Sequence, residues 1–467
     1  MVIKEDCQRH YLKYEDGKMA INKQEHAQWS SGFGFILAAV GSAVGLGNIW
    51  KFPYMVGESG GSAFVIAYLF CIALVGFPIL VAEWLIGRRG QKNPVNTFAD
   101  VAASEGRSRS WKIIGASGVL GGFLILSFYS VIGGWALNYV TKIATGSFVG
   151  QDSDSVAATF DTMLASAGAL TVWHTVFMAV TAIIVGIGVT SGIERAAKIL
   201  MPLLGVILFV IVGYNVMNGG FGDAVAYLFT PDLSKLTEDV MIAALGHAFF
   251  TLSIGMGIMV AYGSYLGREV NLLKTARTVV ILDTVIALAA GLAIFPIIFS
   301  NGLDPASGPG LIFVSLPIAF GSMGAGTIIG TLFFLLITFA AITSAISLLE
   351  PTVEFLEERT SMSRTVSTIV ASIVIWLLGI AALLSFNLWS DFTIMGNNIF
   401  DALDKLTSKF LLPLTGLAAI VFLAWRMDQR SIREELGLSR GAFQIWQFIV
   451  KVVAPLAVII VFVSALK

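Results

Sequence analysis

Eleven apolar stretches, each long enough to cross a lipid bilayer, constrain this chain more than any other feature. A membrane-crossing helix needs about 20 predominantly apolar residues. The stretches lie near residues 33–57, 62–87, 113–141, 172–190, 196–217, 240–266, 275–300, 325–350, 366–386, 398–425 and 446–466. Charged residues make up 13% of the chain, about half the share in a typical soluble domain. We therefore expect an all-α polytopic protein that crosses the bilayer eleven times.

Basic residues fall on alternate connections between these stretches. The connection after the second stretch carries Arg88, Arg89, Lys92, Arg107, Arg109 and Lys112, whereas residues 145–168, after the third, contain no Lys or Arg. Because cytoplasmic loops are enriched in Lys and Arg, we expect a multi-pass inner-membrane protein with a cytoplasmic tail at residues 1–30. An odd number of crossings then places Lys467 on the extracytoplasmic side.

The first stretch contains residues that interrupt a helix. Its sequence "ILAAVGSAVGLGNIWKFPY", residues 36–54, combines three glycines with Asn48, Lys51 and Pro53. Non-helical backbone at membrane depth is tolerated only where protein or a water-lined cavity satisfies the freed groups. Freed carbonyls suit a cation, and N–H groups that open a helix suit a carboxylate. The break therefore predicts a site for both.

A second break is predicted five stretches later, at "TLSIGMG", residues 251–257. Two repeats of five crossings must have opposite orientations in the membrane, as in many secondary transporters. The sequence thus predicts a tail at 1–30, a first repeat at 31–217 and an inverted second repeat at 218–425. A cytoplasmic loop and the eleventh span follow at 426–467. The alternative, that these glycines only allow close helix packing, stays open for the second break.

Four ionisable residues fall within apolar stretches: Glu83, Asp283, Lys51 and Asp404. Each costs free energy unless it is paired or hydrated. Asp283 stands alone in an otherwise apolar helix, which favours a direct ligand for a hard cation. A structural hydrogen bond to unwound backbone is the alternative.

Two adjacent hydroxyls, Thr343 and Ser344, lie in the middle of the eighth stretch, "FAAITSAISLLEP". Hydroxyls in membrane helices often bond back to a carbonyl of their own helix. Beside a cation-binding break, the same pair offers hard oxygen ligands.

Six motifs occur in the order expected of one family. They are "WSSGFGFILAAVGSAVGLGNIWKFPY", "GGSAFVIAYLF" with "AEWLIGRR", "FYSVIGGW", "SGIERAAKILMP", "FFTLSIGMG" and "TSAISLLEP". Together they resemble the neurotransmitter:sodium symporter family, in particular its bacterial amino-acid transporters. The resemblance runs from Trp29 to the last span. It implies a 5+5 inverted-repeat transporter fold in which helices 1 and 6 are broken.

The resemblance also implies two sodium ions. The first ion would be held by the carbonyl of Ala43, the side chains of Asn48, Thr251 and Asp283, and the substrate carboxylate. The second would be held by the carbonyls of Gly41, Val44 and Ala340 and the hydroxyls of Thr343 and Ser344. All of these are hard oxygen donors, as an alkali cation requires.

An amino-acid substrate is implied by the same resemblance. Its carboxylate would meet the N–H groups of Leu46 and Gly47 and the hydroxyl of Tyr129, and its ammonium would meet the carbonyls of Ala43 and Phe250 and the hydroxyl of Ser253. Thr251 and Ser344 would border both the substrate and the ions. Ile125, Phe250, Met256, Ala345 and Leu348 would line the side-chain pocket. An uncharged, polarizable wall favours hydrophobic L-amino acids, aromatic ones included.

Gates are expected on both sides of this site. Lys51 and Asp404 match the family's outer ion pair. Asp401 is an alternative for the acid, and extension of Lys51 to the membrane interface is the alternative for the lysine. On the cytoplasmic side, Tyr265 and Glu358 occupy gate positions, and Trp29 is the expected plug.

The chain departs from the family pattern at several positions. His26 stands where an inner-gate arginine is usual, and Asp283 replaces a neutral amide. Ala287 occupies a place where chloride-dependent members carry a hydroxyl, so we expect transport without chloride. His247 replaces a common glutamine and is either a packed polar residue or part of a gate.

Other classes of protein are less consistent with the sequence. It lacks the HExxH and Walker A motifs that would indicate an enzyme. An ion channel, a ligand sensor that does not transport, and a proton-coupled transporter remain alternatives. No nucleic-acid partner is predicted, and the oligomeric state stays open.

Overall fold

A computed structural model of the chain describes residues 11–15, 18–22, 28–308 and 310–465. His26 and Lys467, which carry the predictions about the gate partner and the side of the C-terminus, lie outside these residues. Two short strands, β1 (Tyr11–Glu15) and β2 (Lys18–Asn22), form an antiparallel hairpin. All other regular elements of the described chain are helices.

Nine helices of the described chain are long and apolar enough to cross a membrane, and a bent pair raises the number to ten. The bent pair is α1 (Gly32–Ala43) and η1–α2 (Gly47–Lys51, Phe52–Glu58), which meet at 46°. The others are α3–η2–α4 (Ser62–Cys71, Ile72–Gly76, Phe77–Gly90), η3–α6 (Arg109–Trp111, Lys112–Ala144), α8 (Ala167–Ile187), η4–α9 (Val189–Glu194, Arg195–Asn218), α13 (Leu272–Ser300), α15 (Gly326–Thr360), α16 (Arg364–Leu384), α17–η7–α18 (Ile399–Lys405, Leu406–Leu411, Leu412–Arg426) and α20–η8–α21 (Arg440–Phe448, Ile449–Val453, Ala454–Ala465).

The predicted sixth span is also a pair of helices. α11 (Glu238–Thr251) and α12 (Ile258–Ser264) are separated by the non-helical residues 252–257. Each half is too short to cross a membrane by itself, and the six-residue break between them is longer than the break of the first span, so the pair is not among the ten. Eleven crossings therefore remain a prediction that treats α11 and α12 as one broken span.

Several connections that the hydropathy pattern leaves without structure are helical. They contain α5 (Pro94–Ser104), α7 (Ser153–Ala165), α10 (Phe221–Phe229), η5 (Leu233–Lys235), η6 (Leu311–Ser315), α14 (Leu316–Ser322) and α19 (Gln429–Leu436). The side chains of Asn93, Asp152 and Asp428 accept hydrogen bonds from the first turns of α5, α7 and α19. These caps are readable in a sequence, although hydropathy does not reveal them.

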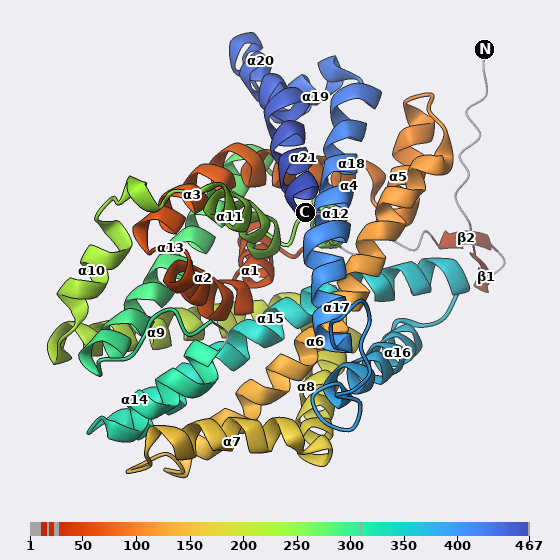
Figure 1. Ribbon diagram of the computed structural model, residues 1–467. Helices are drawn as coiled ribbons and strands as arrows, with labels where there is room; N and C mark the ends of the chain where they lie inside the picture. Colours follow the sequence, from red (N-terminus) through yellow and green to blue (C-terminus); the bar gives the residue numbers. More distant parts are fainter. Residues whose placement is uncertain (1–10, 16–17, 23–27, 309, 466–467) are drawn as a thin grey trace.

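The helices form two packed groups around the broken spans. In one group α6 packs along α15, and both contact α8 and α16. In the other, α12 packs along α4, α11 along α3, and α13 contacts α1, α2 and α4. α7 and α14 lie at one end of the molecule, and α19 and α20 lie at the other (Figure 1). The breaks of the first and sixth spans lie between the two groups.

The contact between α4 and α12 brings two backbones together. A Cβ atom added to Gly87 would lie 2.1 Å from the carbonyl oxygen of Val260, and one added to Gly263 would lie 2.7 Å from that of Trp84. Real Cβ atoms do not approach an oxygen so closely, so any side chain at either position forces the helices apart. Glycine is required here for close approach.

We expect Gly87→Ala to destabilise the protein by about 1–3 kcal/mol, the usual cost of overpacking. Gly205→Ala is the matched control, because Gly205 lies on α9 with no atom within 4 Å of an added Cβ, and alanine favours helix. Thermal unfolding of the detergent-purified variants measures both. Equal unfolding temperatures for the two variants would contradict the close contact.

Candidate functional site

The second break depends on backbone conformations that favour glycine, whereas the glycines of the first break have no positive φ. α1 ends at Ala43, and the chain becomes helical again at Gly47. In the second break, Gly255 and Gly257 have φ of +78° and +73°, in the left-handed region. Ser253 adopts φ +53° without being glycine, a conformation that costs free energy and often marks a functional site.

Glu83 satisfies part of the second break. Its side chain is fully buried on α4, and one carboxylate oxygen accepts the N–H of Gly255 at 2.8 Å. Unwound backbone away from water needs such a partner. Glu83 thus caps the broken helix, a role that explains one of the four ionisable residues in the apolar stretches.

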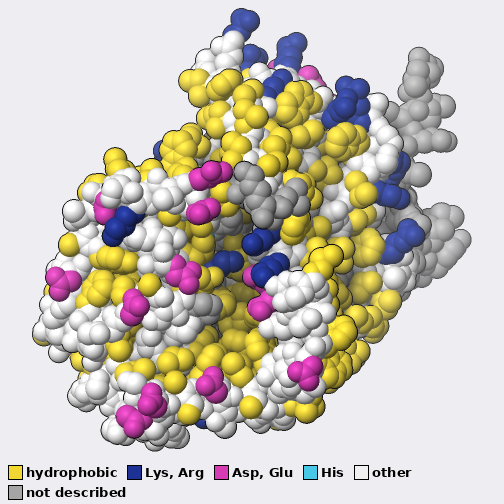
Figure 2. Space-filling view, viewed as in Figure 1, with side chains coloured by type: hydrophobic (Ala, Val, Ile, Leu, Met, Phe, Trp, Pro, Cys, Tyr) yellow, Lys and Arg dark blue, Asp and Glu magenta, His cyan; other side chains and the backbone are white. Residues whose placement is uncertain are grey.

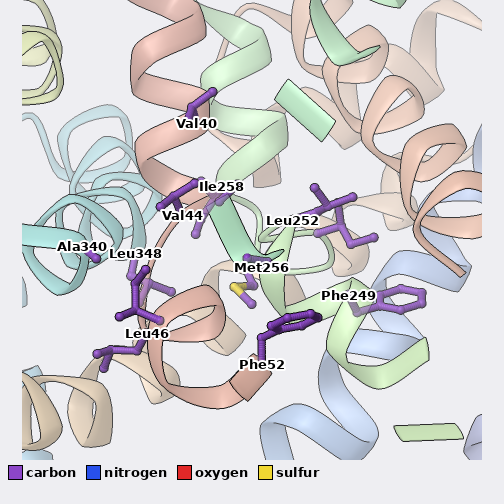
Figure 3. Packing of buried hydrophobic residues seen from close by; sticks show 14 of the residues in the cluster. Val40, Val44, Leu46, Phe52, Phe249, Leu252, Met256, Ile258, Ala340 and Leu348 are labelled. Carbon is purple, nitrogen blue, oxygen red and sulfur yellow. The ribbon is translucent and has the colours of Figure 1, made fainter. Parts of the chain in front are cut away.

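Apolar side chains from both breaks meet in one cluster. Figure 3 shows Leu46 from the first break and Met256 from the second, with Leu348 of α15 beside Leu46. All three are at most 3% exposed. Hydrophobic packing therefore surrounds the polar groups of the site and excludes water from them.

Asp283 lies at the centre of a buried polar cluster. Its carboxylate accepts hydrogen bonds from the amide of Asn48 at 2.8 Å, the hydroxyl of Thr251 at 2.9 Å and the hydroxyl of Tyr68 at 3.0 Å. Asn48 also accepts from the N–H of Gly45 at 3.2 Å. The structure thus brings together Asn48, Thr251 and Asp283, the three side chains predicted at the first sodium site. Tyr68 was missed, because an apolar helix with one tyrosine gives no signal.

The hydroxyls of Thr343 and Ser344 differ in their partners. Thr343 bonds back to the carbonyls of Phe339 and Ala340 in its own helix, at 3.1 and 3.0 Å. Ser344 instead donates across to the end of α1, to the carbonyl of Ser42 at 3.1 Å. The bond-back interpretation therefore holds for Thr343 and fails for Ser344, whose hydroxyl joins α15 to the first break.

A small cavity lies between the two breaks. Its volume is about 20 Å³, enough for about one water molecule, so its walls must separate to admit an amino acid. It is lined by Ser42, Ala43, Gly45, Gly47, Ile125, Tyr129, Phe250, Ser253, Met256, Ser344 and Leu348. At one wall the N–H of Leu46 donates to the hydroxyl of Tyr129 at 3.2 Å.

Most of the residues predicted to bind substrate line this cavity. Leu46, Thr251 and Ala345 are not among the lining residues. The side chain of Thr251 bonds to Asp283, and Ala345 is fully buried in α15. Ser42 and Gly45 line the cavity but were missed. Ser42 lies between two residues that were predicted, Gly41 and Ala43, and its small polar side chain inside an apolar span was the available signal.

A larger depression, of about 620 Å³, lies between α10 and the turn after α2. Asp223, Asp232 and Lys235 are among its lining residues. It is open to the surface and lies away from both breaks. We place the candidate site at the smaller cavity, because the polar groups freed by the breaks converge there.

The predicted outer ion pair is not formed. The ion pairs of the described residues do not include one between Lys51 and Asp404. The ammonium of Lys51 lies 4.5 Å from the ring centroid of Phe250, and Asp404 accepts from Ser408 at 2.9 Å. Figure 2 shows a hollow beside α17 with charged side chains at its rim and hydrophobic ones within.

His247 is buried, with its ring packed against Phe52, Phe64 and Tyr68.

Trp29 covers the other side of the site. Its indole N–H donates to the carbonyl of Tyr262 at 3.1 Å, and its ring contacts Tyr262 and Tyr265 at 5.1 and 5.9 Å. Nearby, Ser30 donates through its N–H to the buried carboxylate of Glu194 at 2.9 Å. The segment before α1 is thus held against both α12 and η4, which is consistent with a plug.

Glu358 and Tyr265 have different principal partners. Glu358 accepts from the N–H of Asn93 and from the amide of Asn96 at the start of α5, both at 2.8 Å. Tyr265 donates to Glu350 at 2.8 Å, and Glu350 forms an ion pair with Arg364 at 2.5 Å. The fully buried Glu350 was missed, because it lies at the end of an apolar stretch, where charges are common.

The donor set of the site suits an alkali cation. It consists of one carboxylate, one amide, hydroxyls and backbone carbonyls, all of them hard ligands. Within the described parts of the chain there is no group of three or more His, Cys, Asp or Glu that could hold a metal ion.

Comparison with known proteins agrees with this geometry. The model of the Sodium:neurotransmitter symporter family matches residues 26–159 and 153–467. The sodium-dependent transporter YhdH of Bacillus subtilis (strain 168) is 36% identical over 448 residues, which are 95% of this chain and 98% of that protein. A sodium-dependent transporter of Haemophilus influenzae is 36% identical over 458 residues, 96% of this chain and 100% of that protein.

A solved structure shares the fold. The crystal structure of MhsT in complex with L-phenylalanine has a TM-score of 0.87 and 44% sequence identity to this chain, and the match covers 94% of this chain and 99% of MhsT. The match supports the transporter fold inferred from the broken helices. The chain is a multi-pass membrane transporter and not an enzyme, and it belongs to the sodium:neurotransmitter symporter family.

Proposed function

We propose that the protein couples sodium entry to the uptake of hydrophobic L-amino acids, aromatic ones included, by alternating access. The observation that carries this proposal is Asp283. Its side chain is fully buried between the breaks, its hydrogen-bond donors are neutral, and the ion pairs of the described residues do not include it. A buried carboxylate without a cation is costly. A bound sodium ion offsets that cost.

Two sodium ions fit the two polar clusters. At the first, the carboxylate of Asp283, the side chains of Asn48 and Thr251 and the carbonyl of Ala43 surround the ion together with the substrate carboxylate. Substrate and ion then raise each other's affinity, because each supplies charge that the other needs. This mutual stabilisation is the physical basis of coupling.

The second ion lies between α1 and α15 in our proposal. Its ligands are the carbonyls of Gly41, Val44 and Ala340 and the hydroxyls of Thr343 and Ser344. The hydroxyl hydrogen of Ser344 already faces the carbonyl of Ser42, so its lone pairs point elsewhere and can coordinate a cation. Binding there would draw α15 and the first break together.

The substrate would lie in the small cavity. The hydroxyl of Tyr129 and the N–H of Leu46, already within hydrogen-bond distance of each other, would both turn to its carboxylate. Ile125, Met256 and Leu348 would contact its side chain, and none of them is charged. L-phenylalanine bound to the similar protein MhsT supports a ligand of this class.

Transport without chloride is part of the proposal. Asp283 provides fixed negative charge beside the first sodium ion. Ala287, one turn further along α13, is fully buried and has no hydroxyl to donate to an anion. His247 is surrounded by three aromatic rings, an environment that does not favour an anion.

Alternating access requires closure on each side in turn. Trp29 with Tyr265, and the ion pair of Glu350 with Arg364, would open toward the cytoplasm. Lys51, Phe250 and Asp404 would close the outer side, with Asp404 approaching Lys51 when substrate is bound. We place the end that carries α19 and α20 in the cytoplasm, because the connections with most Lys and Arg lie there.

Uptake by the protein in liposomes tests the function. We expect labelled L-leucine and L-phenylalanine to accumulate under an inward sodium gradient and not when potassium replaces sodium. An imposed proton gradient without sodium is the control for the proton-coupled alternative. Accumulation driven by protons alone would contradict sodium coupling, and binding without accumulation would indicate a sensor.

Asp283→Asn tests the carboxylate. Loss of the charge removes the attraction for the first sodium ion, so we expect the sodium concentration for half-maximal uptake to rise about tenfold or more. Asp154→Asn, on the exposed face of α7, should leave this sodium concentration unchanged.

Replacing chloride with gluconate should not alter wild-type uptake. A large drop in gluconate would show that the buried carboxylate does not substitute for chloride.

Ser344→Ala tests the second ion. Without this hydroxyl one ligand is lost, and we expect weaker sodium-dependent stabilisation in thermal unfolding and a lower apparent sodium affinity in uptake. Thr331→Ala is the control on the same helix, because the hydroxyl of Thr331 donates to the carbonyl of Thr327 in that helix, at 2.6 Å. If both variants bind sodium as the wild type does, Ser344 is not a ligand.

A further inference from the structure

Ser42 and Ser253 join the two helix breaks by a reciprocal pair of hydrogen bonds. The hydroxyl of Ser42 donates to the hydroxyl oxygen of Ser253 at 3.3 Å, and the hydroxyl of Ser253 donates to the backbone carbonyl of Ser42 at 3.0 Å. Both side chains are buried, at 2% and 5% exposed, and both line the small cavity. The pair is therefore part of the wall of the candidate site.

This pairing fixes the orientation of the Ser253 hydroxyl. A hydroxyl has one hydrogen and two lone pairs. The hydrogen of Ser253 is used by the carbonyl of Ser42, and one lone pair is used by the hydroxyl of Ser42. One lone pair remains, and it can accept a single hydrogen bond from a ligand in the cavity.

The backbone at Ser253 also depends on this contact. Its φ of +53° is unfavourable for a residue with a side chain, so the conformation needs support from its surroundings. The contacts to Ser42 supply two hydrogen bonds to the same side chain. Without them, the hydroxyl of Ser253 is free to rotate toward other acceptors.

We propose that Ser42 is a positioning residue that makes the site selective for a primary ammonium group. The inference rests on the proposed function and on the ammonium contacts that the family resemblance implies, with Ser253 and the carbonyls of Ala43 and Phe250. A primary ammonium has three N–H groups for these three acceptors, whereas an N-methyl ammonium has two. Ser42 acts through Ser253, by holding one lone pair toward the third N–H.

The test compares binding of L-phenylalanine and N-methyl-L-phenylalanine to the purified full-length protein in saturating sodium. We expect the wild type to prefer the primary amine and Ser42→Ala to reduce that preference about three- to tenfold, the range for one hydrogen bond. Ser253→Ala should reduce it similarly. In the Ser42→Ala/Ser253→Ala double variant, the loss should not exceed that of Ser253→Ala alone.

The control variant is Ser130→Ala, because Ser130 is fully buried in α6 and bonds to carbonyls of its own helix. If Ser42→Ala unfolds at a lower temperature than Ser130→Ala, Ser42→Cys is used in its place. Cysteine fills the position of the serine side chain but is a weaker hydrogen-bond donor. Equal loss of affinity for both ligands would show that Ser42 only supports packing, and an added loss in the double variant would show that it acts without Ser253. Either result overturns the proposal. A wild type that binds neither ligand would instead overturn the proposed amino-acid substrate.

Discussion

The need to satisfy unwound backbone inside a membrane governs this structure. Two helices stop within the protein, and the N–H and C=O groups released there have no water to bind. The carboxylate of Glu83 accepts the N–H of Gly255, and the side-chain oxygen of Asn48 accepts the N–H of Gly45. Because the membrane interior offers no other partners, each break recruits polar residues that a continuous helix would not need.

These polar residues then create the conditions for binding. Asp283 is placed among Asn48, Tyr68 and Thr251 because they belong to, or pack against, the interrupted segments. Their hydrogen bonds orient the carboxylate, yet none of them neutralises it. The arrangement keeps a charge at the centre of the protein that stays unbalanced without a cation. In the function proposed above, stability and ion affinity are two consequences of one cluster.

Much of this arrangement could be predicted from the sequence. The hydropathy pattern located nearly every long helix, and the glycines at 255 and 257 located the second break, because left-handed backbone favours glycine. Asp283 was singled out because a lone acid in an apolar helix is unusual, and the family resemblance implied that Asn48 and Thr251 lie beside it. Side-chain direction was harder to predict. The different hydrogen bonds of Thr343 and Ser344 depend on which face of α15 meets α1. Lys51 lies over Phe250 and does not pair with Asp404, because the distance between Lys51 and Asp404 depends on how the helices tilt.

The glycine contact between α4 and α12 has a consequence for movement. Two helices whose backbones touch over a turn cannot slide past each other without collision, and Glu83 also ties α4 to Gly255 in the break that precedes α12. α4 and α12 therefore behave as one rigid body. Any change in direction between the halves of the sixth span must then be absorbed by residues 252–257, which makes the binding segment itself the hinge.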